Sequence, residues 1–144
     1  MSLPLDDMYR DLILDHFEHP RNCREMTEPE GTEEGHNPLC GDHVDIQVRT
    51  EDGMLENLSV CTRGCAICTA SGSIMSGVIK KRSMDEAKAL IQVMKAYLKG
   101  EGELPESEQR ADLKALSGIR KFPVRIKCAL LPWTTLELIL NKLS

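Results

Sequence analysis

Aromatic side chains, long apolar runs and an excess of positive charge are what this 144-residue sequence lacks. Aromatic residues make up 3% of the chain, with Trp133 as its one tryptophan, so the core is predicted to be mostly aliphatic. No apolar run approaches the roughly 20 residues that span a bilayer, and residues 1–7 lack the basic start and apolar core of a signal peptide. The net charge of −5 leaves no basic excess for phosphate binding. We therefore expect a cytoplasmic protein that binds neither nucleic acid nor a membrane.

The length and the 41% content of hydrophobic residues suit one domain over residues 1–144, large enough to bury a core without disulfide bonds. No internal repeat or low-complexity tract divides the chain. In a reducing compartment its six cysteines are more plausible as metal ligands, reactive thiols or small core residues than as disulfides.

The first half of the chain carries one helical pattern and one strand pattern. Apolar spacing predicts an amphipathic helix over residues 6–19, and residues 21–37, rich in Pro, Gly, Glu and Asn, are predicted to form an irregular loop. Alternation from Val44 onward, a turn at residues 51–53 and a return through Val60 predict a β-hairpin.

The second half is predicted to be mainly helical. Ser83 and Glu86 match a capping box, and Pro132 suits only the first turn of a helix, so Cys128 should lie at or just before a helix start. The predicted segments are helices over 66–81 (buried, with many small residues), 83–98, 112–116 and 131–143, a solvated loop over 100–109, and an extended stretch over 123–128.

Three widely separated cysteines each stand in a stretch that suits a metal ligand. Thiolates so far apart can share one ion only if the whole fold gathers them. Cys40 and Asp42 offer a soft and a hard ligand on either side of a glycine, and Cys65 sits at a predicted strand-to-helix junction, where the positive helix end favours an ionised sulfur. With Cys128 they form a candidate set of four ligands for Zn²⁺, whose negative charge Arg125 and Lys127 could offset.

Other interpretations of these residues compete with the metal site. Any single cysteine is more often a small core residue than a ligand. The spacing Cys61-x3-Cys65-x2-Cys68 matches radical S-adenosylmethionine enzymes, but 144 residues cannot supply their large barrel. For Cys23, Cys61 and Cys68 structural or incidental roles are favoured, although Cys68 could lie near the metal without binding it. The histidines lack zinc-finger spacing and are predicted to be surface or helix-end residues, with His43, beside Asp42, as the exception.

With these residues in view, the chain resembles the U-type iron-sulfur cluster assembly scaffolds (IscU/NifU N-terminal-like), and within them the SufU branch. The segments that carry the resemblance cover nearly the whole chain. Lys127 stands where the IscU branch has a histidine, and residues 122–127 do not match the signal that the dedicated Hsp70 chaperone reads. Cys61, Cys68 and Pro132 depart from the usual pattern. The matching segments are Tyr9-Arg10-Asp11, Asp15-His16, residues 37–42, 64–67, 70–71 and 122–129, and Trp133.

The resemblance implies an α+β fold of the SufE/NifU-like kind, with a small antiparallel β-sheet covered by helices. It implies a zinc ion held by Cys40, Asp42, Cys65 and Cys128, and a pyridoxal-phosphate cysteine desulfurase of the SufS type that hands persulfide sulfur to Cys40, with downstream cluster-assembly proteins as further partners. Two alternatives stay open. One is a scaffold that builds a transient [2Fe-2S] cluster on the same ligands, and the other is a zinc-stabilised interaction module without sulfur transfer.

Overall fold

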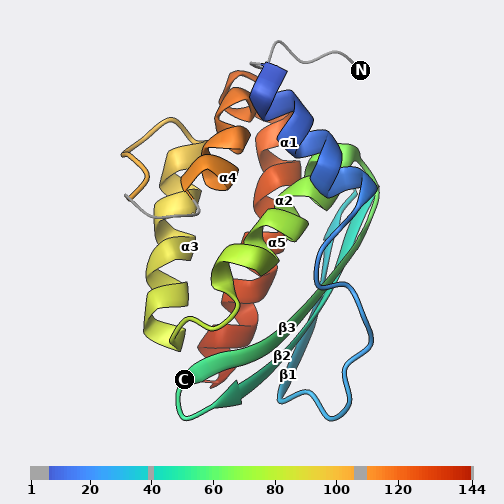
Figure 1. Cartoon of the computed structure of the whole chain (residues 1–144), viewed down its shortest axis with the longest axis vertical. Coiled ribbons are helices and arrows are strands. Elements are labelled where there is room, and N and C mark those ends of the chain that lie inside the picture. Colours follow the sequence, from blue (N-terminus) through green and yellow to red (C-terminus); the bar gives the residue numbers. More distant parts are fainter. Residues whose placement is uncertain (1–6, 39–40, 106–109, 144) are drawn as a thin grey trace.

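A three-stranded antiparallel sheet and a layer of helices on one of its faces form the structure (Figure 1), a computed structural model that describes residues 7–38, 41–105 and 110–143. The predicted α+β fold is confirmed. The strands lie in the order β1-β2-β3. In chain order the elements are α1 (Asp7–Glu18), β1 (Gly31–Asn37), β2 (Asp42–Glu51), β3 (Met54–Arg63), α2 (Ala66–Ile79), α3 (Met84–Leu98), α4 (Arg110–Lys114), the 3-10 helix η1 (Ala115–Lys121) and α5 (Pro123–Leu143).

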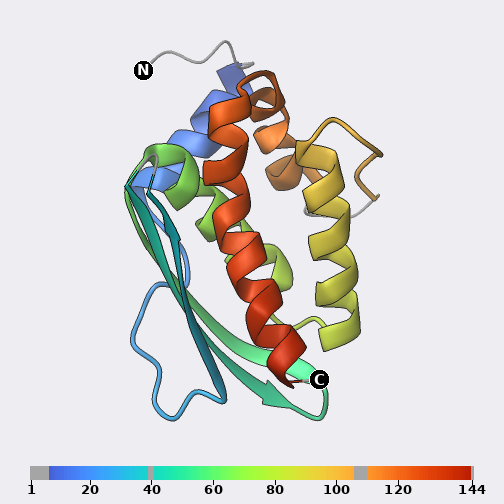
Figure 2. The same cartoon turned by 180° about the vertical axis from the view of Figure 1, so that it is seen from behind.

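Helices α2 and α5 pack directly on the sheet, and α1 and α3 pack on those two helices (Figure 2). Val44, Ile46 and Val48 of β2 face inward, are at most 1% exposed and join the helices in one hydrophobic cluster. Alternate residues of β2 face the opposite side of the sheet, as the pleat of a strand requires. No helix in the described part of the chain is both long enough and apolar enough to cross a membrane.

Several predicted elements are confirmed. The hairpin is β2-β3, and its two turn residues Asp52 and Gly53 both have positive φ, as a tight turn that matches strand twist needs. Helix α2 is buried, and Gly72 in it lies so close to Val60 that an added Cβ would be 3.1 Å from that side chain. The capping box of α3 forms with both of its hydrogen bonds, through Ser83 and Glu86.

The prediction of an irregular loop over residues 21–37 was wrong for its last part, because residues 31–37 form strand β1. The sequence of β1, GTEEGHN, has no apolar alternation. Its inward-facing positions include Gly31 and Gly35, where an added Cβ would collide with Ile139 and Thr135 of α5. Glycine therefore replaces the apolar residues of an ordinary strand because α5 lies against the backbone itself.

The C-terminal predictions need the largest correction. Residues 123–128 are helical rather than extended, since α5 begins at Pro123 and Pro132 lies inside it. An interior proline costs a helix about 3 kcal/mol. Contacts of α5 with α2, α3 and the sheet stabilise the continuous helix against this cost, and Trp133 is fully buried with its indole N–H donating to Ser71 Oγ at 3.0 Å. Cys128 thus lies within a helix and not before one.

Helical structure near residue 112 also extends beyond its predicted limits. The helix predicted over 112–116 is observed as α4, which starts at residue 110, and the chain then continues as η1 to Lys121. The loop predicted over 100–109 carries no helix or strand at residues 101–105, and the remaining part, 106–109, lies outside the described residues.

Cys23 and Cys61 form a disulfide, contrary to the expectation that the cysteines would not pair. Their Cα atoms are 4.8 Å apart, within the usual range for a disulfide. The segment before β1 runs along β3: Asn22 O accepts from Val60 N at 2.8 Å, and Ser59 Oγ accepts from Arg24 N at 3.1 Å. This alignment, which no local pattern indicates, brings the two sulfur atoms together.

Candidate metal centre

Three of the four predicted ligands meet at one end of the sheet. Asp42 is the first residue of β2, Cys65 is the N-cap of α2 and lies two residues after the end of β3, and Cys128 is on the second turn of α5. One carboxylate oxygen of Asp42 and the sulfur atoms of Cys65 and Cys128 all lie within 4.8 Å of one another. Cys40, the fourth predicted ligand, lies outside the described residues.

The hairpin itself positions Asp42 beside Cys65. Pairing of His43 with Arg63 places the start of β2 next to the end of β3. Between Arg63 and Cys65, Gly64 has φ +135° and leaves no room for a side chain, because an added Cβ would lie 2.8 Å from the Cα of Asp42 and closer still to its Oδ1. In this tight junction Asp42 Oδ1 accepts a 2.8 Å hydrogen bond from the backbone N–H of Cys65.

The second oxygen of Asp42 has no such partner. Asp42 is 2% exposed, and among the buried side-chain nitrogen and oxygen atoms of the described residues its Oδ2 is the one without a hydrogen bond. A buried carboxylate oxygen left unpaired is costly, and such atoms commonly mark the position of a missing ion or water. A carboxylate oxygen of Asp42 lies within 4.8 Å of two cysteine sulfurs, so a cation fits this place better than a neutral donor.

Cys65 and Cys68 have different environments, although one helical turn separates them. The sulfur of Cys65, half-buried, accepts a hydrogen bond from the backbone N–H of Cys68 at 3.4 Å at the N-terminus of α2, where the helix dipole favours negative charge. The side chain of Cys68 is fully buried in the hydrophobic cluster. The backbone N–H of Cys68 therefore contacts the candidate ligand Cys65, whereas the side chain of Cys68 belongs to the core.

Cys128 is fully buried and receives a contact that the sequence did not reveal. The side-chain amide of Asn37, itself 8% exposed, donates to the sulfur of Cys128 at 3.7 Å. Asn37 pairs with Asp42 across β1 and β2, so both side chains face inward from the same rung of the sheet. The position of Asn37 three residues before Cys40 could have suggested that it belongs to the site. Its contact with Cys128, however, depends on β1 being a strand.

The predicted basic neighbours lie on the same helix as Cys128. Lys127 is exposed and Arg125 is half-buried. Contacts to the two sulfur atoms include the amide of Asn37, the N–H of Cys68 and, on Cys128, the carbonyl of Val124 at 3.9 Å. Two sulfurs and one carboxylate form a donor set that suits zinc, which binds Cys and Asp ligands in tetrahedral sites.

Comparison with known proteins agrees with this architecture. Residues 8–129 match the family model described as NifU-like N terminal domain, and the chain belongs to that family. It is 34% identical over 133 residues to the zinc-dependent sulfurtransferase SufU of Bacillus subtilis, and the aligned region covers 92% of this chain and 89% of that protein. It is also 31% identical to the iron-sulfur cluster assembly scaffold protein IscU of Streptococcus pyogenes, covering 92% of this chain and 82% of the relative.

Solved structures share the fold over most of their length. A nitrogen-fixing NifU-like protein (N-terminal) from Brucella abortus superposes with a TM-score of 0.85 at 26% identity, covering 95% of this chain and 94% of that one. A proposed iron-sulfur cluster assembly scaffold protein for the SUF system from Fervidobacterium islandicum gives a TM-score of 0.83 at 25% identity, covering 90% and 94%.

Proposed function

We propose that this protein acts in iron-sulfur cluster assembly as a zinc-containing sulfur acceptor, which takes persulfide sulfur from a pyridoxal-phosphate cysteine desulfurase of the SufS type. The observation that carries this function is that ligand atoms of Asp42, Cys65 and Cys128 lie within 4.8 Å of one another and that the buried carboxylate of Asp42 has one unpaired oxygen. The relative from Bacillus subtilis, named a zinc-dependent sulfurtransferase, supports the same chemistry. Downstream cluster-assembly proteins would receive the sulfur or the cluster.

Zinc would be held by Cys40, Asp42, Cys65 and Cys128. The three described ligands leave one position of a tetrahedral site to be filled, and Cys40 stands two residues before Asp42 in the sequence. When bound, zinc keeps its cysteine ligands deprotonated and therefore nucleophilic. The hydrogen bond from Cys65 N–H holds one oxygen of Asp42, and the other oxygen has no hydrogen-bond partner and is left for the ion.

Cys40 would accept the sulfur. Its thiolate attacks the outer sulfur of the desulfurase cysteine persulfide, a new S–S bond forms on Cys40, the S–S bond on the desulfurase breaks, and the desulfurase cysteine leaves as a thiolate. No electrons are gained or lost overall. Cys65 and Cys128 each accept a hydrogen bond from a neighbouring group, which suits them to stay as fixed ligands while Cys40 takes the sulfur.

A second candidate function is a scaffold that assembles a transient [2Fe-2S] cluster on the same residues. It is favoured by the 31% identity to a protein named an IscU assembly scaffold. One oxygen ligand among three thiolates would make such a cluster easier to release than all-thiolate ligation. Residues 1–144 would act as one unit in either case, and we keep the cytoplasm as the proposed compartment.

Metal analysis and a desulfurase assay test these functions together. Freshly purified protein should be colourless and contain zinc for sulfur transfer, or brown with iron for cluster building. Cys40→Ala should abolish stimulation of a cysteine desulfurase, while the control Cys68→Ala, which removes a thiol outside the ligand set, should keep it. Undiminished stimulation in Cys40→Ala removes Cys40 from its role.

Two further outcomes separate the alternatives. If iron and sulfide are used to reconstitute a cluster, an Asp42→Ala cluster that is no longer-lived than the parent's contradicts the releasing role of the carboxylate. If zinc removal unfolds the protein and no desulfurase responds to it, the protein is a zinc-stabilised interaction module.

A further inference from the structure

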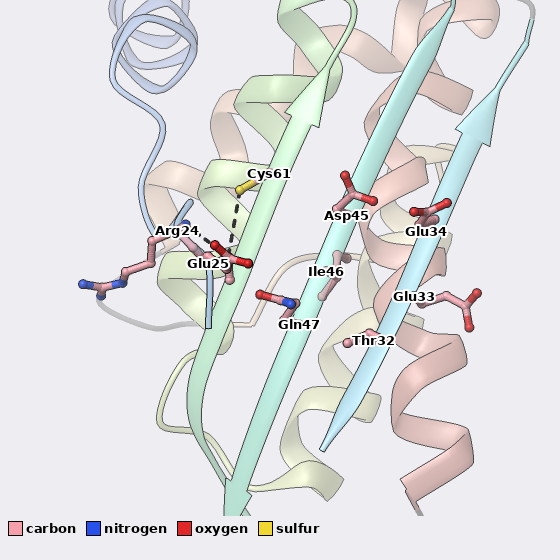
Figure 3. Close-up of a pocket in the computed structure, with 10 residues that line it drawn as sticks. Arg24, Glu25, Thr32, Glu33, Glu34, Asp45, Ile46, Gln47 and Cys61 are labelled. Carbon is pink, nitrogen blue, oxygen red and sulfur yellow. Dashed lines mark hydrogen bonds between the residues drawn. The ribbon is translucent and has the colours of Figure 1, made fainter. Parts of the chain in front are cut away.

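A second group of metal-ligating side chains lies on the outer face of the sheet, the face that the helices do not cover. Strand pairing places His36 of β1 directly opposite His43 of β2, and Glu34 directly opposite Asp45. Because alternate residues of a strand face the same way, all four side chains are on one face and form two neighbouring rungs. Figure 3 shows Glu34 and Asp45 on adjacent strands with both carboxylates on the same side.

The two histidine rings lie as close together as two ligands of one ion. Nδ1 of His36 and Nδ1 of His43 are 3.1 Å apart, and the ring centroids are 4.3 Å apart with the planes at 66°. Two zinc–nitrogen bonds of about 2.0–2.1 Å at right-angled to tetrahedral geometry put the nitrogens about 2.9–3.4 Å apart. An ion could therefore replace the hydrogen that now joins the rings with little movement of either.

Two carboxylates complete the arrangement, each in a different role. Nε2 of His43, the nitrogen that faces away from His36, is 3.1 Å from Asp45 Oδ1. Histidine ligands usually donate their second ring N–H to a carboxylate, which fixes the tautomer and the ring orientation. An oxygen of Glu34 lies within 4.8 Å of a nitrogen of each histidine and is placed to be the third ligand.

We propose that His36, His43 and Glu34 bind a first-row divalent transition-metal ion, with Asp45 orienting His43. This outer-face site offers two imidazoles and one carboxylate, a set that suits zinc or ferrous iron and leaves coordination positions open to water or another ligand. Glu34 and His36 are exposed and His43 is half-buried, so the ion can exchange with solvent. Glu34 and Asp45 also line an open hollow of about 760 Å³, bounded on its far side by Cys61 of β3.

The outer-face site is separate from the candidate metal centre, although the two are adjacent in sequence. Asn37 and Asp42 form the next rung of the same strand pair, but they face inward. The sheet thus separates an oxygen- and nitrogen-rich site on its outer face from a sulfur-rich one on its inner face. The outer-face site does not depend on the function proposed above.

Titration with Co²⁺ distinguishes the two sites in the intact protein. Cobalt bound to thiolates gives an intense sulfur-to-metal charge-transfer absorption, whereas cobalt on imidazole and carboxylate does not. Equilibrium dialysis should therefore find one equivalent of Co²⁺ that adds no charge-transfer absorption. This equivalent should be lost in His36→Asn and in the double variant His36→Asn/His43→Asn, with the charge-transfer absorption unchanged.

Two further variants sharpen the test. His19→Ala removes an exposed histidine elsewhere and should leave Co²⁺ binding as in the parent. Asp45→Asn should keep the stoichiometry and weaken binding at the outer-face site about 10-fold to 100-fold, the usual effect of removing the partner of a histidine ligand. The proposal is overturned if the parent does not bind an equivalent of Co²⁺ without charge-transfer absorption, or if His36→Asn still binds that equivalent with the same affinity. It is also overturned if His19→Ala loses this equivalent as completely as His36→Asn does.

Discussion

Replacement of Gly64 by alanine tests whether the junction between β3 and α2 is built around Asp42. The new Cβ would lie 2.8 Å from the Cα of Asp42 and would overlap its Oδ1, the atom that accepts the N–H of Cys65. Because one colliding atom belongs to the backbone, a rotamer change cannot relieve the contact. The carboxylate must move, and its hydrogen bond with Cys65 must lengthen or break.

The magnitude follows from three contributions. A residue other than glycine at φ +135° costs about 1–3 kcal/mol, crowding of a packed site costs about 1–3 kcal/mol, and loss of a hydrogen bond to a charged acceptor costs about 1.5–3 kcal/mol. These contributions overlap, so Gly64→Ala should lower the free energy of unfolding by about 3–5 kcal/mol.

Gly53→Ala is the matched control. Gly53 also has positive φ, +76°, but an added Cβ there meets nothing within 4 Å. This variant should lose only about 1 kcal/mol, and the effect of alanine on the unfolded chain is the same in both variants. The difference between them therefore reports the crowding of Asp42 and the loss of its hydrogen bond, together with any extra backbone strain at φ +135°.

Urea unfolding and competition with a zinc chelator measure the two consequences. Gly64→Ala should be less stable than Gly53→Ala by at least about 2 kcal/mol and should bind zinc more weakly, whereas Gly53→Ala should bind zinc like the parent. Equal losses of stability in the two variants, with equal zinc affinity, would refute the view that Gly64 is required for the position of Asp42.

Three other perturbations probe the rest of the structure. Reduction with a phosphine should destabilise the protein by up to about 4 kcal/mol, because the disulfide of Cys23 and Cys61 joins residues 38 apart. The stability of a Cys23→Ser/Cys61→Ser variant should not change with the reductant. Equal urea midpoints of the parent with and without the reductant would contradict a stabilising role of the disulfide. Burial, with a neighbouring arginine, lowers the pKa of His16, whose Nδ1 lies 2.7 Å from Ser73 Oγ. The unfolded chain therefore binds more protons than the folded one, and the stability of the fold should decrease as the pH drops below about 6.5. In pH-dependent melts, His16→Gln should reduce this dependence of stability on pH. Ser83→Ala should cost about 1 kcal/mol in thermal unfolding by removing the N-cap of α3, and no change would show that this helix end is held by packing alone.

The prediction of surface or helix-end histidines is confirmed for His16 as a helix-end residue. It lies in the last turn of α1, although only 7% of it is exposed. His43 was singled out because it adjoins Asp42, yet its ring contacts His36 and Asp45 on the opposite face of the sheet. Neighbours along a strand face opposite ways, so proximity in sequence indicated the wrong partner.

Local patterns determined much of this protein. The capping box of α3 and the hairpin turn at Asp52-Gly53 follow from interactions within a few residues, and the many small residues of α2 indicate its burial, so the sequence alone predicted all three. The same holds for the identity of the candidate ligands Asp42, Cys65 and Cys128, because residue type and immediate context are what make a side chain suitable for a metal.

Tertiary structure decided the features that depend on distant segments. Strand β1 exists because glycines let α5 lie against its backbone, α5 continues through Pro132 because several elements pack on it, and Cys23 meets Cys61 because the segment before β1 pairs with β3. The contact of Asn37 with Cys128 and the rung of His36 and His43 have the same origin. Backbone hydrogen bonds and close packing between elements outweigh local propensities of a few kcal/mol, and only the folded chain shows which distant residues those forces bring together.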